Sequence, residues 1–433
     1  MTFSGFSFSR RQWLIVGVAV GVIIIASLVL TGIIPGFVRK RADSVKLSFV
    51  SFEDRRVFAP VITSFRKLHP EVEVSYRQVD FRDYENSLIN NLAAGKAPDI
   101  FMFHSSWLPK HFDKIIPVGD DQFNLAKFEE LFPVVARQDF APSGVIFALP
   151  LYLDTLVLLY NKDIFDSEGV ALPPRNWLEF QNLVAQLRQV DKKNNLARPA
   201  AAIGGSENTV NNATALLNLL MLQTGSPMVD DTFTRANFAS QGLTAFNFYL
   251  KFADAGSDFY TWNDAQPLAA DLFAQGQLPM MFGYRYQLLQ LRQQAPLLNI
   301  GVAAIPQPGA AGPGVAYADY YGLAVSNKTN YQRQAWDFII HAAANAEANQ
   351  LYLEAISEPP ALRSLISRKI NDQEIGVFAR QALLARSWPR VDETAIRQLF
   401  DAMIKSVLAD QLRSDEALRQ AEAEITRLMQ RRI

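Results

Sequence analysis

The chain has 433 residues, 49 % hydrophobic and 20 % charged, a composition that excludes a disordered or collagen-like protein. Its 42 Lys and Arg nearly balance its 43 Asp and Glu, so no overall positive field would attract nucleic acid. Cysteine is absent, which excludes disulfides, thiolate catalysis, cysteine-bound metals and a lipid-modified cysteine anchor. The length predicts two or three domains.

The N-terminal segment is apolar enough to cross a membrane. No residue from Gln12 to Val38 is charged, and the nearly wholly apolar run Trp13 to Ile34 exceeds the roughly 20 residues that span a bilayer. Arg10 and Arg11 precede it and basic residues 39–41 follow it, so positive charge does not orient it. Its length and the missing cleavage site favour an uncleaved signal anchor over residues 1–43. A cleaved signal peptide is the alternative.

Strands and helices alternate from residue 45 to residue 103. Apolar residues alternate with polar ones over 45–49 and 72–76, as in strands, and follow helical spacing over 57–68 and 84–92. In the first of these helices Pro60 is tolerable because it lies in the first turn. Gly95 suits the position after a helix end, and Pro98 stops the helix before the strand that Asp99 opens. This order predicts a parallel sheet covered by helices.

The same kind of alternation restarts at Leu156. Helical patterns cover 178–187, 213–222, 246–252 and 415–432, and Asn176 with Glu179 is typical of an N-cap and its acidic partner. Residues 307–314 are rich in Gly and Pro, which predicts a long loop. The second half of the chain is therefore expected to form a second α/β lobe.

A series of phrases occurs in fixed order along the chain. The phrases are Leu92–Asp99, Leu149–Thr155, Val157–Phe165, Pro173–Phe180, Asp271–Met281, Asn299–Pro306, Tyr317–Ser326 and Pro359–Arg363. Together they resemble the extracellular solute-binding proteins of ABC importers, of the maltose-binding type that takes up sugars and oligosaccharides. The resemblance covers about residues 44 to 430, nearly the whole chain.

The resemblance implies a periplasmic-binding-protein-like type II fold, with two α/β lobes joined by a hinge of several segments. Lobe one would take residues 44–152 and 322–360, and lobe two residues 156–318 and 364–433. The three crossings between them would lie near 151–155, 318–321 and 359–363. The solute would bind between the lobes, on loops at the carboxyl ends of strands.

Candidate ligand-binding residues in lobe one follow its strands. Sugar recognition needs flat aromatic faces for the CH patches of the ring and planar polar groups for its hydroxyls. A helix cap with solvated charges is the alternative for the first group, and core packing is the alternative for Trp107. The candidates are Phe52, Glu53, Asp54 and Arg55 after the first strand, and His104, Ser105, Ser106 and Trp107 after the strand that Asp99 opens.

The crossings and lobe two supply the other candidates. Asp154 is the strongest, because the family commonly places an acidic ligand contact in this phrase. Tyr284 stands where the family usually has Trp, so the stacking platform would be tyrosine. The alternatives are hinge packing for Tyr152 and for one or two of the tyrosines at 317–321, and a capping loop for 206–208. The set is Tyr152, Asp154, Ser206, Glu207, Asn208, Trp262, Tyr284, Arg285, Tyr286, Tyr317, Asp319, Tyr320 and Tyr321.

Motifs for catalysis are missing from the sequence. The four histidines show no metal-ligand spacing, and neither a Gly-x-Ser-x-Gly elbow nor a phosphate-binding glycine loop occurs. Acid pairs such as Asp80 and Asp83 are expected by chance among 43 acids. We therefore expect no enzyme, no catalytic residue, no metal and no cofactor.

The resemblance implies a membrane-anchored monomer on the extracytoplasmic side that captures a carbohydrate and delivers it to ABC permease subunits. Its partners would be the small-molecule solute, the permease and the membrane, and not nucleic acid. A non-sugar solute, such as a glycerophosphodiester, a polyamine or an anion, is one alternative. A sensory or interaction module that has kept the fold is another.

Overall fold

The computed structural model describes residues 9–30, 44–192, 195–309 and 314–430. Parts of three predicted segments lie outside these residues: the end of the apolar run (31–34), the centre of the Gly- and Pro-rich loop (310–313) and the last residues of the C-terminal helix (431–432). The first described element is helix α1 (Arg10–Leu30). Within the described residues, its stretch Arg10–Leu28 alone is long and apolar enough to cross a membrane.

The first lobe is built around a six-stranded mixed sheet in the order β2-β1-β3-β13-β4, with β5 beside β13. Its first three strands are parallel, as predicted, whereas β13 returns from the second lobe and runs antiparallel to β3. The elements are β1 (Val45–Ser51), α2 (Arg55–Leu68), β2 (Val72–Gln78), the 3₁₀ turn η1 (Phe81–Asp83), α3 (Tyr84–Ala93), β3 (Ile100–His104), α4 (Leu108–His111), η2 (Phe112–Lys114), β4 (Ile115–Ile116), α5 (Leu125–Leu131), α6 (Val134–Phe140), β5 (Leu149–Pro150), β13 (Tyr321–Ser326), α13 (Gln332–Ala344), α14 (Ala346–Ile356) and α15 (Arg363–Lys369).

Local sequence signals explain several boundaries of this lobe. Gly95 has φ of 69°, the left-handed conformation expected after the end of α3. Helix α2 begins at Arg55, earlier than expected, because the Asp54 carboxylate accepts the backbone N–H of Arg56 and caps it. Pro60 therefore lies in the second turn and not the first. Because proline has no backbone N–H, it cannot donate to the carbonyl four residues before it.

The second lobe has a three-stranded antiparallel sheet in the order β10-β7-β11, flanked by helices. The alternation of strands and helices predicted its order of elements but not the direction of its strands, which tertiary pairing sets. The elements are β7 (Val157–Asn161), α7 (Lys162–Ser167), α8 (Trp177–Leu187), β8 (Gln189–Val190), β9 (Leu196–Arg198), α9 (Ala213–Gln223), α10 (Ala239–Leu250), α11 (Ala269–Ala274), β10 (Met280–Gly283), α12 (Arg285–Gln294), β11 (Ile300–Ala303), α17 (Glu393–Leu408) and α18 (Ser414–Gln430).

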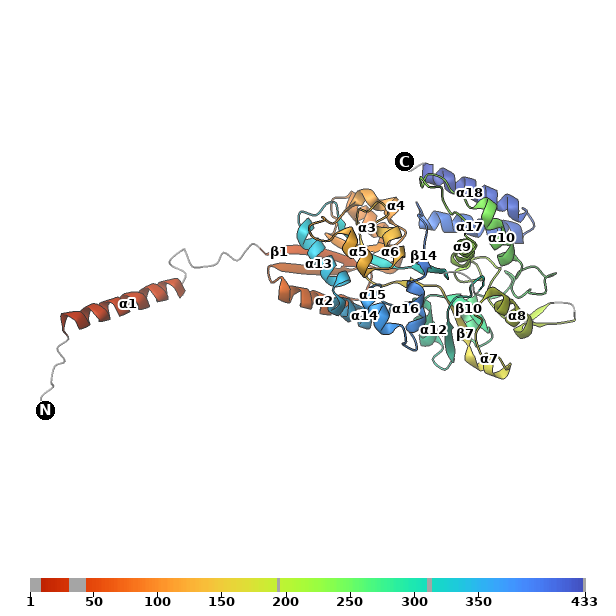
Figure 1. Cartoon of the computed structure of the whole chain (residues 1–433), viewed down its shortest axis with the longest axis horizontal. Coiled ribbons are helices and arrows are strands. Elements are labelled where there is room, and N and C mark those ends of the chain that lie inside the picture. The colour runs from red at the N-terminus through yellow and green to blue at the C-terminus, as the bar shows by residue number, and fades with distance from the viewer. Residues whose placement is uncertain (1–8, 31–43, 193–194, 310–313, 431–433) are drawn as a thin grey trace.

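A small sheet joins the lobes. It has the order β14-β12-β6 and is made of β6 (Asp154–Thr155), β12 (Ala316–Asp319) and β14 (Ala385–Arg386), with α16 (Gly376–Ala382) packed beside it. Figure 1 shows the lobes side by side, with β14, α15 and α16 where they meet. Two of the predicted crossings, at 151–155 and 318–321, thus include strands of one hinge sheet.

Each lobe has its own buried core. The core of lobe one draws on residues within 47–153, 318–366 and 379–385, whereas that of lobe two draws on residues within 156–317 and 388–429 and on Phe378. The expected start of the last lobe-two segment at residue 364 does not match this division. Leu365 and Ile366 of α15 pack in the core of lobe one, and residues 378–385 contribute to both cores.

Candidate functional site

Asp154 ties the hinge sheet to lobe two. It lies opposite Asp319 in the antiparallel pair β6 and β12. Its carboxylate is buried and accepts the backbone N–H of Thr155 and that of Arg285, each at 2.7 Å. Burial, reinforced by the neighbouring Glu358, raises the pKa of Asp154 well above its ordinary value. The start of α12 is thereby attached to the first crossing.

Asp319 ties the hinge sheet to lobe one. Its Oδ1 lies 2.5 Å from Nε2 of His104, and Nδ1 of His104 lies 2.7 Å from the hydroxyl of Ser106. Burial acts to raise the pKa of Asp319, but the charge and hydrogen bond of His104, with the charges of Arg390 and Arg397, outweigh it and lower the pKa. The end of β3, where sequence analysis placed a candidate loop, thus contacts the second crossing.

An aromatic cluster covers the lobe-one side of this junction. The ring of Tyr321, which begins β13, packs against Phe52 at 4.8 Å, His104 at 4.7 Å and Trp107 at 6.0 Å between centroids. Trp107 is 6 % exposed and also stacks on Tyr84. Trp107 is therefore a support for Tyr321, which is itself only half-buried.

Tyr286 is the exposed aromatic side chain on the lobe-two side. It is 44 % exposed and stacks on the buried Tyr284, with centroids 6.1 Å apart and ring planes 10° from parallel. The residue between them, Arg285, is buried: its Nε donates to the carbonyl of Ser357 at 2.9 Å and its guanidinium pairs with Glu374. Of the two rings, the one that faces solvent is Tyr286 and not Tyr284, where the sequence placed the stacking platform.

Two further carboxyls lie at the junction. Glu358 directly precedes the third crossing, where Leu153 donates its backbone N–H to the carbonyl of Pro359 at 3.0 Å. Burial raises the pKa of Glu358 to about 8, against the opposing charge of Arg285, and burial raises the pKa of Glu53 to about 7. Sequence analysis found Glu53 but missed Glu358. The position of Glu358, directly before the phrase Pro359–Arg363, was the signal that could have identified it.

Three candidates have structural partners in lobe one and the hinge. Asp54 caps α2, as the alternative interpretation had it, while Arg55 is exposed beside it. Tyr152 is half-buried and pairs with Pro360 across an isolated bridge, which is hinge packing. The backbone N–H of the buried Ser105 donates to the carbonyl of Tyr320.

Trp262 does not line lobe two, contrary to the expectation. It is fully buried, and its Nε1 donates to the hydroxyl of Thr209 at 3.0 Å. A Cβ on Gly205 would lie 2.6 Å from its ring, so the glycine allows the indole to pack against the backbone. The polar residues around Trp262 in the sequence suggested exposure, but tertiary packing places the indole in the core.

Tyr320 is likewise a core residue. It is 1 % exposed, and its hydroxyl donates to Oδ2 of the buried Asp139 at 2.6 Å. Asp139 also accepts from the hydroxyl of Ser387, in the segment that leads back to lobe two. Tyr320 therefore packs the hinge, and its neighbour Tyr321 faces the junction.

The loop 206–208 acts as a cap, which was the alternative interpretation. The carboxylate of Glu207 accepts the backbone N–H of Thr214 at 2.9 Å and its hydroxyl at 2.6 Å, in the first turn of α9. Ser206 is fully buried, and the side-chain oxygen of Asn208 accepts from Lys405 of α17 at 2.9 Å. These side chains hold α9 and α17 together.

An ion pair joins the lobes away from the hinge sheet. Nζ of Lys110, in α4 of lobe one, lies 2.9 Å from Glu85 and 3.3 Å from Asp392 of lobe two. The side chain of Asp392 also caps α17 by accepting the backbone N–H of Ala395. Sequence analysis missed this contact, since its partners lie far apart in the chain.

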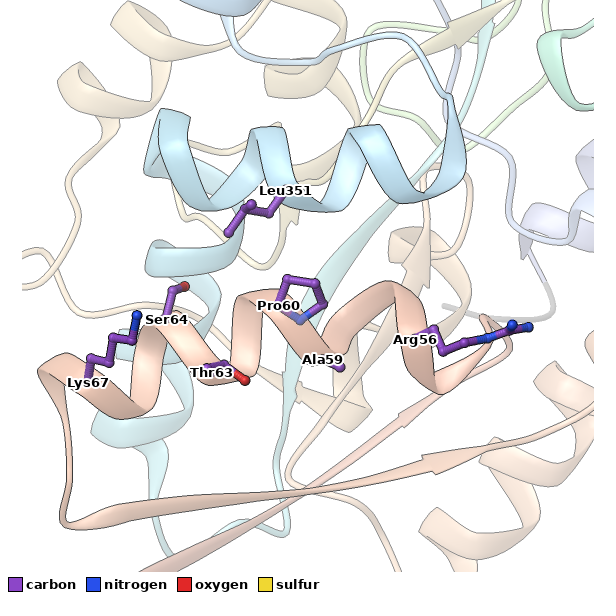
Figure 2. A pocket seen from close by; sticks show the side chains of 7 residues that line it. All are labelled: Arg56, Ala59, Pro60, Thr63, Ser64, Lys67 and Leu351. Carbon is purple, nitrogen blue, oxygen red and sulfur yellow. The ribbon is translucent and has the colours of Figure 1, made fainter.

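A surface depression lies away from the junction. It has a volume of about 510 Å³ and lies on the outside of lobe one between α2 and α14 (Figure 2). Aromatic side chains are absent from its lining, which consists of Arg56, Ala59, Pro60, Thr63, Ser64, Lys67 and Leu351. Among the described residues, no group of three or more His, Asp and Glu could hold a metal ion. The junction between the lobes is therefore the better candidate site.

The chain matches the model of one protein family, that of bacterial extracellular solute-binding proteins, over residues 61–375. It is 23 % identical over 301 residues to a binding protein of Brucella abortus (strain 2308), covering 68 % of this chain and 70 % of that one. It is 22 % identical over 331 residues to the maltotriose-binding protein of Pyrococcus abyssi, covering 74 % and 66 %.

The fold matches a solved structure. The sugar-binding protein MalE of Xanthomonas citri superposes with a TM-score of 0.75 over 90 % of this chain and 98 % of that one, at 20 % identity. The two-lobe fold that the sequence predicted is thereby confirmed.

The buried carboxyls make stability depend on pH. A carboxyl with a higher pKa in the folded protein stabilises it fully below the ordinary value of 4.5, and this contribution is lost as pH rises through the folded pKa. We expect the free energy of unfolding to fall between about pH 5 and 8, by at most about 1.4 kcal/mol per pH unit for each of Glu53 and Glu358. Chemical denaturation across this range measures it.

The variant Glu358→Gln should flatten this profile, because it removes one of the titrations that produce it. The control is Glu354→Gln, an exposed carboxyl on α14 that accepts from Gln350, which should leave the profile unchanged. A profile that is equally steep in both variants would contradict the assignment to Glu358.

Proposed function

Because the chain belongs to the family of bacterial extracellular solute-binding proteins, we propose that it captures a carbohydrate between its lobes and delivers it to the permease of an ABC importer. The observation that carries this proposal is the pairing of aromatic rings with hydrogen-bonding carboxyls at the junction. Tyr321 faces it from lobe one and Tyr286 from lobe two, and the charge of Asp319, in the hinge sheet, acts on the hydroxyls of both. Rings suit the CH faces of a sugar and carboxylates suit its hydroxyls.

The chain is a binding protein and not an enzyme, as its family indicates. Its mechanism is a population shift: a solute that contacts both lobes stabilises the closed arrangement over the open one. The sugars of relatives support the class of solute, since one relative binds maltotriose and a protein of the same fold is sugar-binding. The acids of the junction disfavour the alternative that the solute is an anion.

Helix α1 serves in this proposal as the anchor that keeps the binding lobes at the outer face of the membrane. Its stretch Arg10–Leu28 is long and apolar enough to cross a membrane, and most of its described side chains are exposed. A single span of this kind suits a chain without the cysteine that a lipid anchor would need. The protein would work there as a monomer.

A carbohydrate should raise the unfolding temperature of the full chain. A ligand that binds only the folded protein stabilises it by about 2.7 kcal/mol at a hundredfold excess over its dissociation constant. Thermal-shift screening against sugars, phosphodiesters, polyamines and anions, in a detergent without a sugar headgroup, tests this. The carbohydrate proposal is wrong if only non-sugar solutes shift the transition.

The interlobe ion pair should favour the closed arrangement. Asp392→Asn removes the charge that faces Lys110 but keeps an N-cap for α17, so we expect solute affinity to fall about two- to fivefold, by about 0.4 to 1 kcal/mol. Calorimetric titration with the solute found by the screen measures the change, and X-ray scattering measures lobe separation. Asp80→Asn, a cap within lobe one, is the control. Equal affinities in all three proteins would exclude the ion pair as a contributor.

The protein should remain in the membrane with its N-terminus intact. Fractionation of cells followed by mass analysis of the N-terminal peptide measures this. Replacing Val18 and Ile24, exposed apolar residues of α1, by Asp should release the protein from the membrane, because charge in the bilayer core is costly. Recovery of an unmodified soluble protein that begins near Ala42 would instead identify a cleaved signal.

A further inference from the structure

Carboxyls from four separate segments meet at the junction. Glu53 follows β1, Asp154 and Asp319 face each other in the hinge sheet, and Glu358 precedes the third crossing. They are close enough to affect one another: Glu358 raises the pKa of Asp154, while Glu53 and Asp319 raise that of Glu358. Acids that repel one another across a hinge ionise readily only beside a compensating positive charge.

Two of the cations beside these acids are already engaged. Arg285 is the cation that acts on Glu358, but its guanidinium pairs with Glu374 and its Nε donates to the carbonyl of Ser357. His104 is bonded to Asp319 and Ser106. Besides burial, the main influences on the pKa of Asp154 are two acids, Glu358 and Asp319, and the backbone N–H groups of Arg285 and Thr155.

Glu358 offers an unsatisfied acceptor. The residue is 9 % exposed, and its Oε2 is buried without a hydrogen-bond partner among the described residues. The backbone on both sides is fixed, because the carbonyl of Ser357 accepts from Arg285 and that of Pro359 accepts from Leu153. A buried carboxylate oxygen without a donor is costly unless a ligand supplies one.

The rings of the junction suit the same kind of ligand. Tyr284 and Tyr286 lie near Asp154 and Asp319, and Tyr321 lies near Asp319 and Tyr286, since these groups act on the tyrosine hydroxyls. The face of a tyrosine ring attracts a cation, and carboxylates beside it add to the attraction. An ammonium group meets both requirements, whereas a neutral hydroxyl brings a donor but no charge.

We infer that the solute is an amino sugar, whose protonated amine is received by Glu358 with Asp154 and Asp319 around it, while tyrosine rings cover the sugar. This inference rests on the proposed function and narrows it. It adds the chemical feature by which the site would select among carbohydrates, which is a positive charge on the sugar.

The test compares amino sugars with their uncharged N-acetyl counterparts and with solutes of other charge. The full chain, in a detergent without a sugar headgroup, is titrated calorimetrically with glucosamine and its dimer and trimer, with their N-acetyl counterparts, and with maltotriose, galacturonic acid and spermidine. We expect an amino sugar to bind at least about tenfold more tightly than its N-acetyl counterpart, since hydrogen bonds to a charged group are the stronger ones. Equal or tighter binding of the acetylated or neutral sugar overturns the inference.

Variants locate the selectivity. Glu358→Gln keeps the shape of the side chain and should abolish the preference for the amino form without lowering the thermal stability of the unliganded protein. Glu358→Asp, which keeps the charge, should retain part of it, and the exposed Glu354→Gln should retain all of it. A preference that persists undiminished in Glu358→Gln overturns the assignment.

The results separate this inference from the proposed function. Binding confined to neutral or acidic sugars overturns the amino sugar and leaves carbohydrate capture standing. Binding of spermidine with no sugar overturns carbohydrate capture and, with it, the amino sugar. The absence of any carbohydrate ligand in the panel contradicts both.

Discussion

The buried carboxylate of Asp154 is the contact on which the arrangement of the lobes depends. It accepts the backbone N–H of Arg285 while its own strand pairs with the strand of Asp319. Asp319 in turn contacts His104 at the end of β3. A chain of three short contacts thus runs from the sheet of lobe one, through the hinge, to the first residues of α12. Moving one lobe against the other changes the surroundings of these groups first.

This hinge is built from groups that are unfavourable to bury. Asp154 and Glu358 both have raised pKa values because burial disfavours their charged forms. A hinge made only to connect two lobes would be more stable with apolar side chains, since replacing buried charges by well-packed hydrophobic residues is often stabilising. The acids are consequently better explained by binding than by folding. The core aromatic residues nearby, such as Trp107, supply the packing that holds them in place.

Sequence analysis predicted what depends on local pattern and missed what depends on distant partners. The parallel order of β1, β2 and β3, the left-handed Gly95 and the Asn176 cap all followed from spacing. Asp154 was found because its phrase resembles a family. The burial of Trp262, the antiparallel second sheet and the pairing of Lys110 with Asp392 each depend on residues remote in sequence. The residues next to these positions in the sequence do not indicate which distant residues they contact.

The ion pair between the lobes is too weak to determine closure by itself. An exposed or half-buried pair contributes about 0 to 1 kcal/mol, whereas moving an equilibrium from 1:99 to 99:1 requires about 5.5 kcal/mol of preferential binding. Most of that energy has to come from a solute that touches both lobes at once. Tyr321 on one lobe and Tyr286 on the other are placed for such a contact, with the hinge acids close to both. Release of the solute to a permease also requires an open state that is easily reached once the solute has left. The weakness of the ion pair is therefore consistent with transport, because a stronger latch would hold the lobes closed when empty.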